Sequence, residues 1–218
     1  MKLKKIASLM LAGIMAVSML AGCKTADNNG EEENPVVPVA SDAVTYANDA
    51  LSAKEKEVMT FSGSTELDTL LKKVATNPDN FDTTAIEQMS TTYTLNSNLN
   101  GDQHSWGLHD KVADGLTGQR SAAFKDFNTA PVDKVSQKVV VTGIVSGNLD
   151  EKTAVQMFVD AYAKNFTDKF PATISGYACD YAGEISVVKV ASPEHSDKTA
   201  WVMAIVATQT VTATANAQ

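Results

Sequence analysis

Cysteine and arginine are scarce in this chain of 218 residues, which contains only Cys23, Cys179 and Arg120 of these types. Two cysteines cannot build a disulfide scaffold, so packing must provide most of the stability. The 18 lysines and arginines are outnumbered by 26 acidic residues, and the formal net charge is −8. Nucleic-acid binding needs a basic surface that neutralises phosphates, so we exclude that class of partner.

Sequence patterns of several enzyme classes are also missing. The chain has no Gly-x-Ser-x-Gly elbow of a serine hydrolase. It has neither a glycine-rich phosphate-binding loop nor a His-Glu-x-x-His zinc pattern. These motifs place a nucleophile, a phosphate or a metal at a defined turn or helix, and their absence leaves the catalytic residues unknown.

The amino terminus does carry a recognisable pattern. Three lysines in the first five residues precede an apolar run over residues 6–20, and the tetrapeptide Leu20-Ala21-Gly22-Cys23 closes the segment. A basic start, an apolar core and small residues before a cleavage point are the parts of a secretory signal. Residues 6–22 would span about 25 Å as a helix, which is short for a bilayer core of about 30 Å.

This pattern resembles the signal and lipobox of bacterial lipoproteins, with Leu20, Ala21 and Gly22 before the lipidated Cys23. The resemblance covers residues 1–23 and implies a diacylglyceryl group on the Cys23 thiol, with no other cofactor expected. Two or more acyl chains give stable anchoring. The resemblance therefore implies an extracytoplasmic protein that is held in the outer leaflet of the plasma membrane, or in an outer membrane if the cell has two membranes.

The composition divides the chain into four parts. We expect a signal peptide at residues 1–22 and a lipidated, disordered tether at 23–40, rich in Glu, Asn and Pro. Residues 41–212 have the length and apolar content of one globular domain. Residues 213–218 would form a flexible tail.

The first half of the domain shows mainly helical patterns. Apolar spacing and capping residues predict helices over 42–57 and 65–76 and a short helix ending at Met89. Thr65 and Asp68 resemble a capping box. Thr and Tyr favour a strand over 90–95, and two short helices are expected around 106–116 and 118–127.

The second half predicts a sheet. We expect a strand at 137–146, a helix beginning after Asp150, and then three strands, at 173–181, 184–191 and 198–212. Both faces of the last hairpin are apolar, so helices should cover each face. The predicted class is α+β, with N-terminal helices followed by a β-α-β-β-β unit that forms a mainly antiparallel sheet.

The densest group of chemically active side chains is the segment 102–110, which includes His104, Trp106, His109 and Asp110. Imidazoles and carboxylates can bind a divalent metal. The two histidines are five residues apart, whereas one helical face requires three or four. A surface or structural role, a glycan or small-ligand contact through Trp106, and a metal or catalytic site therefore all stay open.

Two other features have simpler interpretations. Asn96, Asn98, Asn100 and Gly101 imitate part of a calcium-binding loop, but Gly107 stands where the bidentate Glu is needed, so an ordinary polar turn is favoured. Cys179 lies in a strand pattern and is interpreted as a small buried residue.

Three functions follow as hypotheses. The main one is a lipid-anchored protein that binds an envelope ligand or protein partner without catalysis. The alternative is a surface-attached hydrolase, with or without a metal, that uses His104, His109 and Asp110. The third is a structural envelope lipoprotein with no small ligand.

Overall fold

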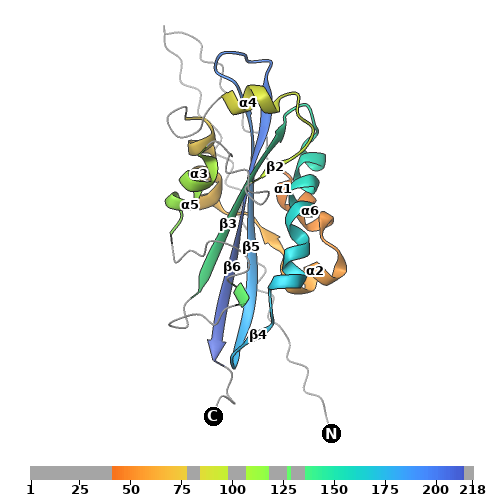
Figure 1. The fold of residues 1–218 in the computed structure, drawn as a ribbon, viewed down its shortest axis with the longest axis vertical. Coiled ribbons are helices and arrows are strands. Elements are labelled where there is room, and N and C mark those ends of the chain that lie inside the picture. Colours follow the sequence, from red (N-terminus) through yellow and green to blue (C-terminus); the bar gives the residue numbers. More distant parts are fainter. Residues whose placement is uncertain (1–40, 78–83, 98–106, 118–126, 129–135, 214–218) are drawn as a thin grey trace, which may run out of the picture. The chain divides into compact units, whose positions relative to one another are not determined.

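The computed structural model describes residues 41–77, 84–97, 107–117, 127–128 and 136–213 (Figure 1). All of them belong to one compact unit, Val39–Gln218. The expected signal peptide, the tether and most of the helix expected at 118–127 lie outside these residues. Within the described ranges, no helix has the length and apolar character needed to span a membrane.

The domain combines helices with one mixed sheet. Its helices are α1 (Ala43–Ala50), α2 (Ala53–Val58), α3 (Thr65–Ala75), α4 (Thr84–Met89), α5 (Leu108–Gly115) and α6 (Glu151–Lys169). Its strands are β1 (Phe61–Ser62), β2 (Asn96–Ser97), β3 (Gln137–Ser146), β4 (Thr173–Ile174), β5 (Tyr177–Ala191) and β6 (Thr199–Ala213). The strand order is β1-β5-β6-β3-β2, with β4 also beside β5. Among the strands in the described ranges, only β1 pairs in parallel, so the predicted α+β class with a mainly antiparallel sheet is confirmed.

Helices cover both faces of the sheet. Residues of α1, α2 and α6 pack with one set of strand side chains, and residues of α3, α4 and α5 pack with the other set. Along β6, Met203 and Ile205 belong to the first core, whereas Val202, Ala204 and Val206 belong to the second. Alternate residues of a strand point to opposite faces, so this strand contributes apolar side chains to two cores. The expectation of a hairpin covered on each face is confirmed.

The long hairpin β5–β6 sets the position of the site described below. Each strand has 15 residues, or about 50 Å of extended chain. Pairing runs without interruption from Tyr177 opposite Ala213 to Ala191 opposite Thr199. The turn between the strands lies beside α4, at the opposite end of the hairpin from Ala213 (Figure 1).

The strongest predicted helix is confirmed as α6. The Asp150 carboxylate accepts a hydrogen bond from the Thr153 amide at 2.9 Å and so caps the helix. That hydrogen bond lowers the pKa of Asp150. Phe158, Tyr162 and Phe166 are fully buried on its inner face, as their spacing predicted.

The helix expected over 42–57 is instead two helices. Ser52 interrupts it, because its side chain accepts from the Glu55 amide while the Glu55 carboxylate accepts from the Ser52 amide. This capping box starts α2 and lets the chain turn between two helices. The helix expected at 65–76 is confirmed as α3, but its cap is Ser64, which accepts from the Leu67 amide, and not Thr65.

The strands expected at 173–181 and 184–191 divide differently. The chain reverses at Ser175 and Gly176, which both have positive φ, and then runs as one strand, β5. A two-residue turn of this kind matches the twist of a hairpin. Gly183 does not break β5: a Cβ there would lie 2.8 Å from the Phe61 ring, so glycine lets β1 approach the strand.

The strand expected at 90–95 is a turn, and strand pairing begins only at Asn96. The Thr92 carbonyl accepts from the Ser146 amide at the end of β3. The Ser90 amide donates to the Ile86 carbonyl and the Thr92 amide to the Met89 carbonyl, so the segment continues the turn that ends α4 despite its β-propensity.

A buried polar network joins β5 and β6 near the open end of the hairpin. Gln209 is fully buried, and its amide nitrogen donates to the Phe127 carbonyl at 2.9 Å and to the Tyr181 hydroxyl at 3.0 Å. The Tyr181 hydroxyl donates to the Pro171 carbonyl at 2.9 Å. Burial raises the pKa of Tyr181 to about 12.

Because Tyr181 is buried in this network, we expect the folded protein to lose stability in alkali. The unfolded chain loses the tyrosine proton at about pH 10, whereas the folded protein keeps the Tyr181 proton until about pH 12. The free energy of unfolding therefore has its full Tyr181 contribution below about pH 10 and loses it as the pH rises towards about 12. The difference in unfolding free energy between wild type and Tyr181→Phe should therefore shrink between these pH values in urea titrations. Tyr93→Phe, at a side chain that is 56% exposed, is the control. A difference that is constant over this range would contradict the prediction.

Candidate functional site

Helix α4 is fixed at one end of the sheet. Ala85, Ile86 and Met89 are buried in the second core. The carbonyl of Ser90, directly after the helix, accepts from the Ser146 hydroxyl at 2.5 Å and from the Asn148 side chain at 2.9 Å. These contacts tie the end of α4 to the end of β3, so side chains on α4 have a defined position.

The turn between β5 and β6 is organised by Ser192, which is 3% exposed. Its hydroxyl oxygen accepts from the amides of Glu194 and His195, each at 3.3 Å. Ser192 and Lys198 close the turn by a backbone hydrogen bond of 2.9 Å, and the Lys198 amide donates to the His195 carbonyl at 2.8 Å. The backbone that carries Glu194 and His195 is therefore well defined.

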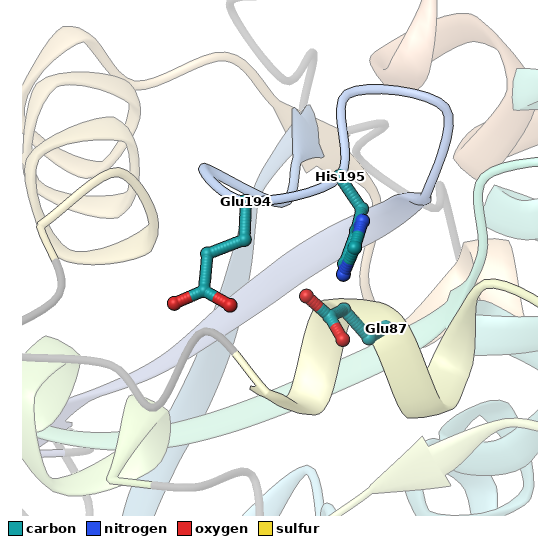
Figure 2. A group of neighbouring side chains, drawn as sticks. All are labelled: Glu87, Glu194 and His195. Carbon is teal, nitrogen blue, oxygen red and sulfur yellow. The ribbon is translucent and has the colours of Figure 1, made fainter.

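The Ser192 hydroxyl also donates to the Glu87 carboxylate at 2.7 Å, which connects the turn to α4. As a result Glu87, Glu194 and His195 gather at one place, with the His195 ring pointing toward the Glu87 carboxylate (Figure 2). One potential ligand atom from each residue lies within 4.8 Å of the other two. Glu87 is half-buried, and the other two residues are exposed.

Among the described residues, no lysine or arginine forms an ion pair with Glu87 or Glu194. Two carboxylates that converge without a positive partner repel each other, and a cation between them would remove that repulsion. Carboxylate oxygens combined with an imidazole nitrogen form a donor set suited to divalent transition metals.

The four residues that the sequence singled out are only partly described. His104 and Trp106 lie outside the described residues. His109 and Asp110 lie on α5, with Nδ1 of His109 3.3 Å from Oδ1 of Asp110. Nε2 of His109 lies 3.2 Å from the Val140 carbonyl oxygen on β3, and a proton on Nε2 satisfies that acceptor. The ring therefore helps hold α5 against the sheet.

The other sequence candidates lie apart from the site. Cys179 is buried on β5 as expected, and burial raises the pKa of its thiol. Of the loop that imitates a calcium site, Asn98, Asn100 and Gly101 lie outside the described residues. Asn96 lies in β2, opposite Ile144 of β3.

Sequence reasoning missed Glu87, Glu194 and His195 as a group. Glu87 and Glu194 are 107 positions apart (194 minus 87), so no local spacing links them. The adjacency of Glu194 and His195 in a polar turn was the only local signal. Glu87 lies on α4, and the packing of α4 against the sheet brings it near the turn.

Comparisons with protein-family models, with curated proteins and with solved structures found no match for this chain. The role of the domain is therefore inferred from its own residues and their contacts.

Proposed function

We propose that this protein is a lipid-anchored extracytoplasmic protein that acts by binding an envelope ligand or protein partner. The observation that carries the proposal is the sequence Leu20-Ala21-Gly22-Cys23 after a basic and apolar start. A lipid on Cys23 would hold the protein at the membrane surface. The acidic and proline-containing residues 24–40 would then act as a spacer between the lipid and the domain.

The character of the domain supports a binding role. Side chains that hold a ligand work best when rigid elements and their hydrogen bonds set their positions. The end of the domain where α4 meets the β5–β6 turn offers such a surface, with exposed Glu194 and His195 next to the half-buried Glu87. The site presents chemically active side chains outward, where a ligand or partner can reach them.

Replacing Cys23 with serine should abolish lipid attachment, because serine lacks the thiol that receives the diacylglyceryl group. The test expresses the full chain in a bacterial host supplied with labelled palmitate and measures the label on the purified protein. Wild type and Cys179→Ser should carry the label, and Cys23→Ser should carry none. A wild-type protein without label, or a label that disappears with Cys179→Ser, would show the proposal to be wrong.

A further inference from the structure

We infer that Glu87, Glu194 and His195 form a binding site for a divalent transition-metal ion of the Zn²⁺ type. All three side chains belong to the folded domain, so the site does not depend on the lipidation of Cys23.

The spacing of the three side chains fits an ion between them. Zinc lies about 2.1 Å from nitrogen and oxygen ligands, so two ligands of a tetrahedral site are roughly 3.4 Å apart. The atoms here lie within 4.8 Å of one another, and small side-chain rotations would close the difference. Glu194 and His195 are exposed, so such rotations meet little resistance. The His195 ring has no hydrogen bond or ion pair with another described residue that a metal would have to displace.

Ser192 prepares the site. Its buried hydroxyl donates to Oε1 of Glu87 and leaves Oε2 available to an ion. The same oxygen accepts from the amides of Glu194 and His195, so one side chain sets the relative position of all three proposed ligands. Residues that orient metal ligands through such hydrogen bonds contribute strongly to metal affinity. Ser192 is therefore a positioning residue.

The donor set distinguishes among metals. Calcium prefers six to eight oxygen ligands, and magnesium usually keeps several waters and few protein ligands. An imidazole nitrogen with two carboxylates favours zinc and its neighbours in the first transition series. Three protein ligands leave at least one coordination position open at the surface, and a water molecule or a donor group of a partner would fill it.

Metal binding can be measured on the full-length protein, free of affinity tags and stripped of metal by a chelator. Isothermal titration with Zn²⁺ should show saturable binding of one ion per chain, and Ca²⁺ and Mg²⁺ should bind far more weakly. Glu87→Gln, Glu194→Gln and His195→Gln should each weaken Zn²⁺ binding by about tenfold or more. Asp197→Asn removes one charge from an exposed side chain of the same turn and should change the affinity by less than about twofold.

The positioning role of Ser192 has its own readout. Ser192→Ala should weaken Zn²⁺ binding by about tenfold while the stoichiometry stays at one ion, because all three ligands are still present. If Ser192 only stabilised the turn, the variant would lower the melting temperature and leave the Zn²⁺ affinity of the folded protein unchanged.

A second measurement on the wild type avoids variants that do not fold. Diethyl pyrocarbonate modifies accessible histidines, and mass spectrometry of peptides reports each histidine separately. Saturating Zn²⁺ should slow modification of His195 by about tenfold or more, in proportion to site occupancy. Absence of saturable Zn²⁺ binding, binding that survives all three glutamine variants, or equal modification of His195 with and without Zn²⁺ would each overturn the inference.

Discussion

Replacing Phe158 with alanine should lower the free energy of unfolding by about 3–5 kcal/mol, the range for large buried aromatic side chains. The Phe158 side chain is fully buried in the core between α6 and the sheet. Its ring packs edge-on against Tyr162, with ring centroids 5.2 Å apart. Removing it deletes apolar burial and leaves a cavity that rigid neighbours cannot fill. Urea denaturation monitored by circular dichroism measures the loss.

Two further variants test the origin of this effect. Lys164→Ala, at an exposed position of the same helix, should change stability by less than about 0.5 kcal/mol. A Cβ at Gly143 would lie 2.8 Å from the Phe158 ring, so Gly143→Ala should destabilise the wild type. The same change should cost less in the Phe158→Ala background, because the clashing ring is gone. Purely additive effects would contradict this packing.

Replacing Gly147 with valine should destabilise the protein by about 3 kcal/mol, at the upper end of the usual cost of overpacking. A Cβ at Gly147 would lie 2.3 Å from the Thr199 hydroxyl oxygen and 2.6 Å from its carbonyl carbon. The Thr199 backbone belongs to β6, and its carbonyl accepts from the Gly147 amide at 2.9 Å. The contact can be relieved only by moving the start of β6 or breaking that hydrogen bond.

Gly63 provides a control position for this prediction. Its added Cβ would meet only a Val44 methyl group at 3.8 Å, an ordinary contact distance. Gly63→Ala should therefore leave the midpoint of thermal unfolding nearly unchanged, whereas Gly147→Val should lower it by several degrees. Equal effects of the two changes would show that the close approach of Gly147 to Thr199 does not limit stability.

The elements that sequence patterns predicted best are those whose signals are local. The ends of β3 match the predicted range 137–146, and α6 begins behind its Asp150 cap. Apolar alternation on both faces of β6 correctly predicted two covered faces of the sheet. Propensity, capping and periodicity act between residues close in sequence, so these features depend little on the rest of the chain.

The errors have tertiary causes. The strand expected at 90–95 did not form, because the Ser90 and Thr92 amides donate back to the end of α4 while the Thr92 carbonyl accepts from Ser146, far along the chain. The expected break in β5 did not occur. Gly183 has no Cβ, so the Phe61 ring of β1 can lie against the strand at this position. Glycine and β-branched residues have local conformational preferences, but contacts with residues far along the chain can override them.

The candidate site is the clearest case in which contacts between distant residues could not be predicted from the sequence. The sequence drew attention to His104, Trp106, His109 and Asp110 because they are neighbours in the chain. The structure instead assembles Glu87 with Glu194 and His195, through the hydroxyl of Ser192. A hydrogen bond between residues 105 positions apart depends on strand order and on the packing of α4.

The sequence by itself determined the α+β class, the long helix and the main strands, because those follow from short-range patterns of apolar and capping residues. It is also the whole basis for proposing a lipid anchor at Cys23. Only the tertiary structure decided which side chains meet at the end of the β5–β6 hairpin. The physical reason is that these side chains come together when a helix packs on the sheet, and such packing cannot be predicted from the spacing of residues along the chain.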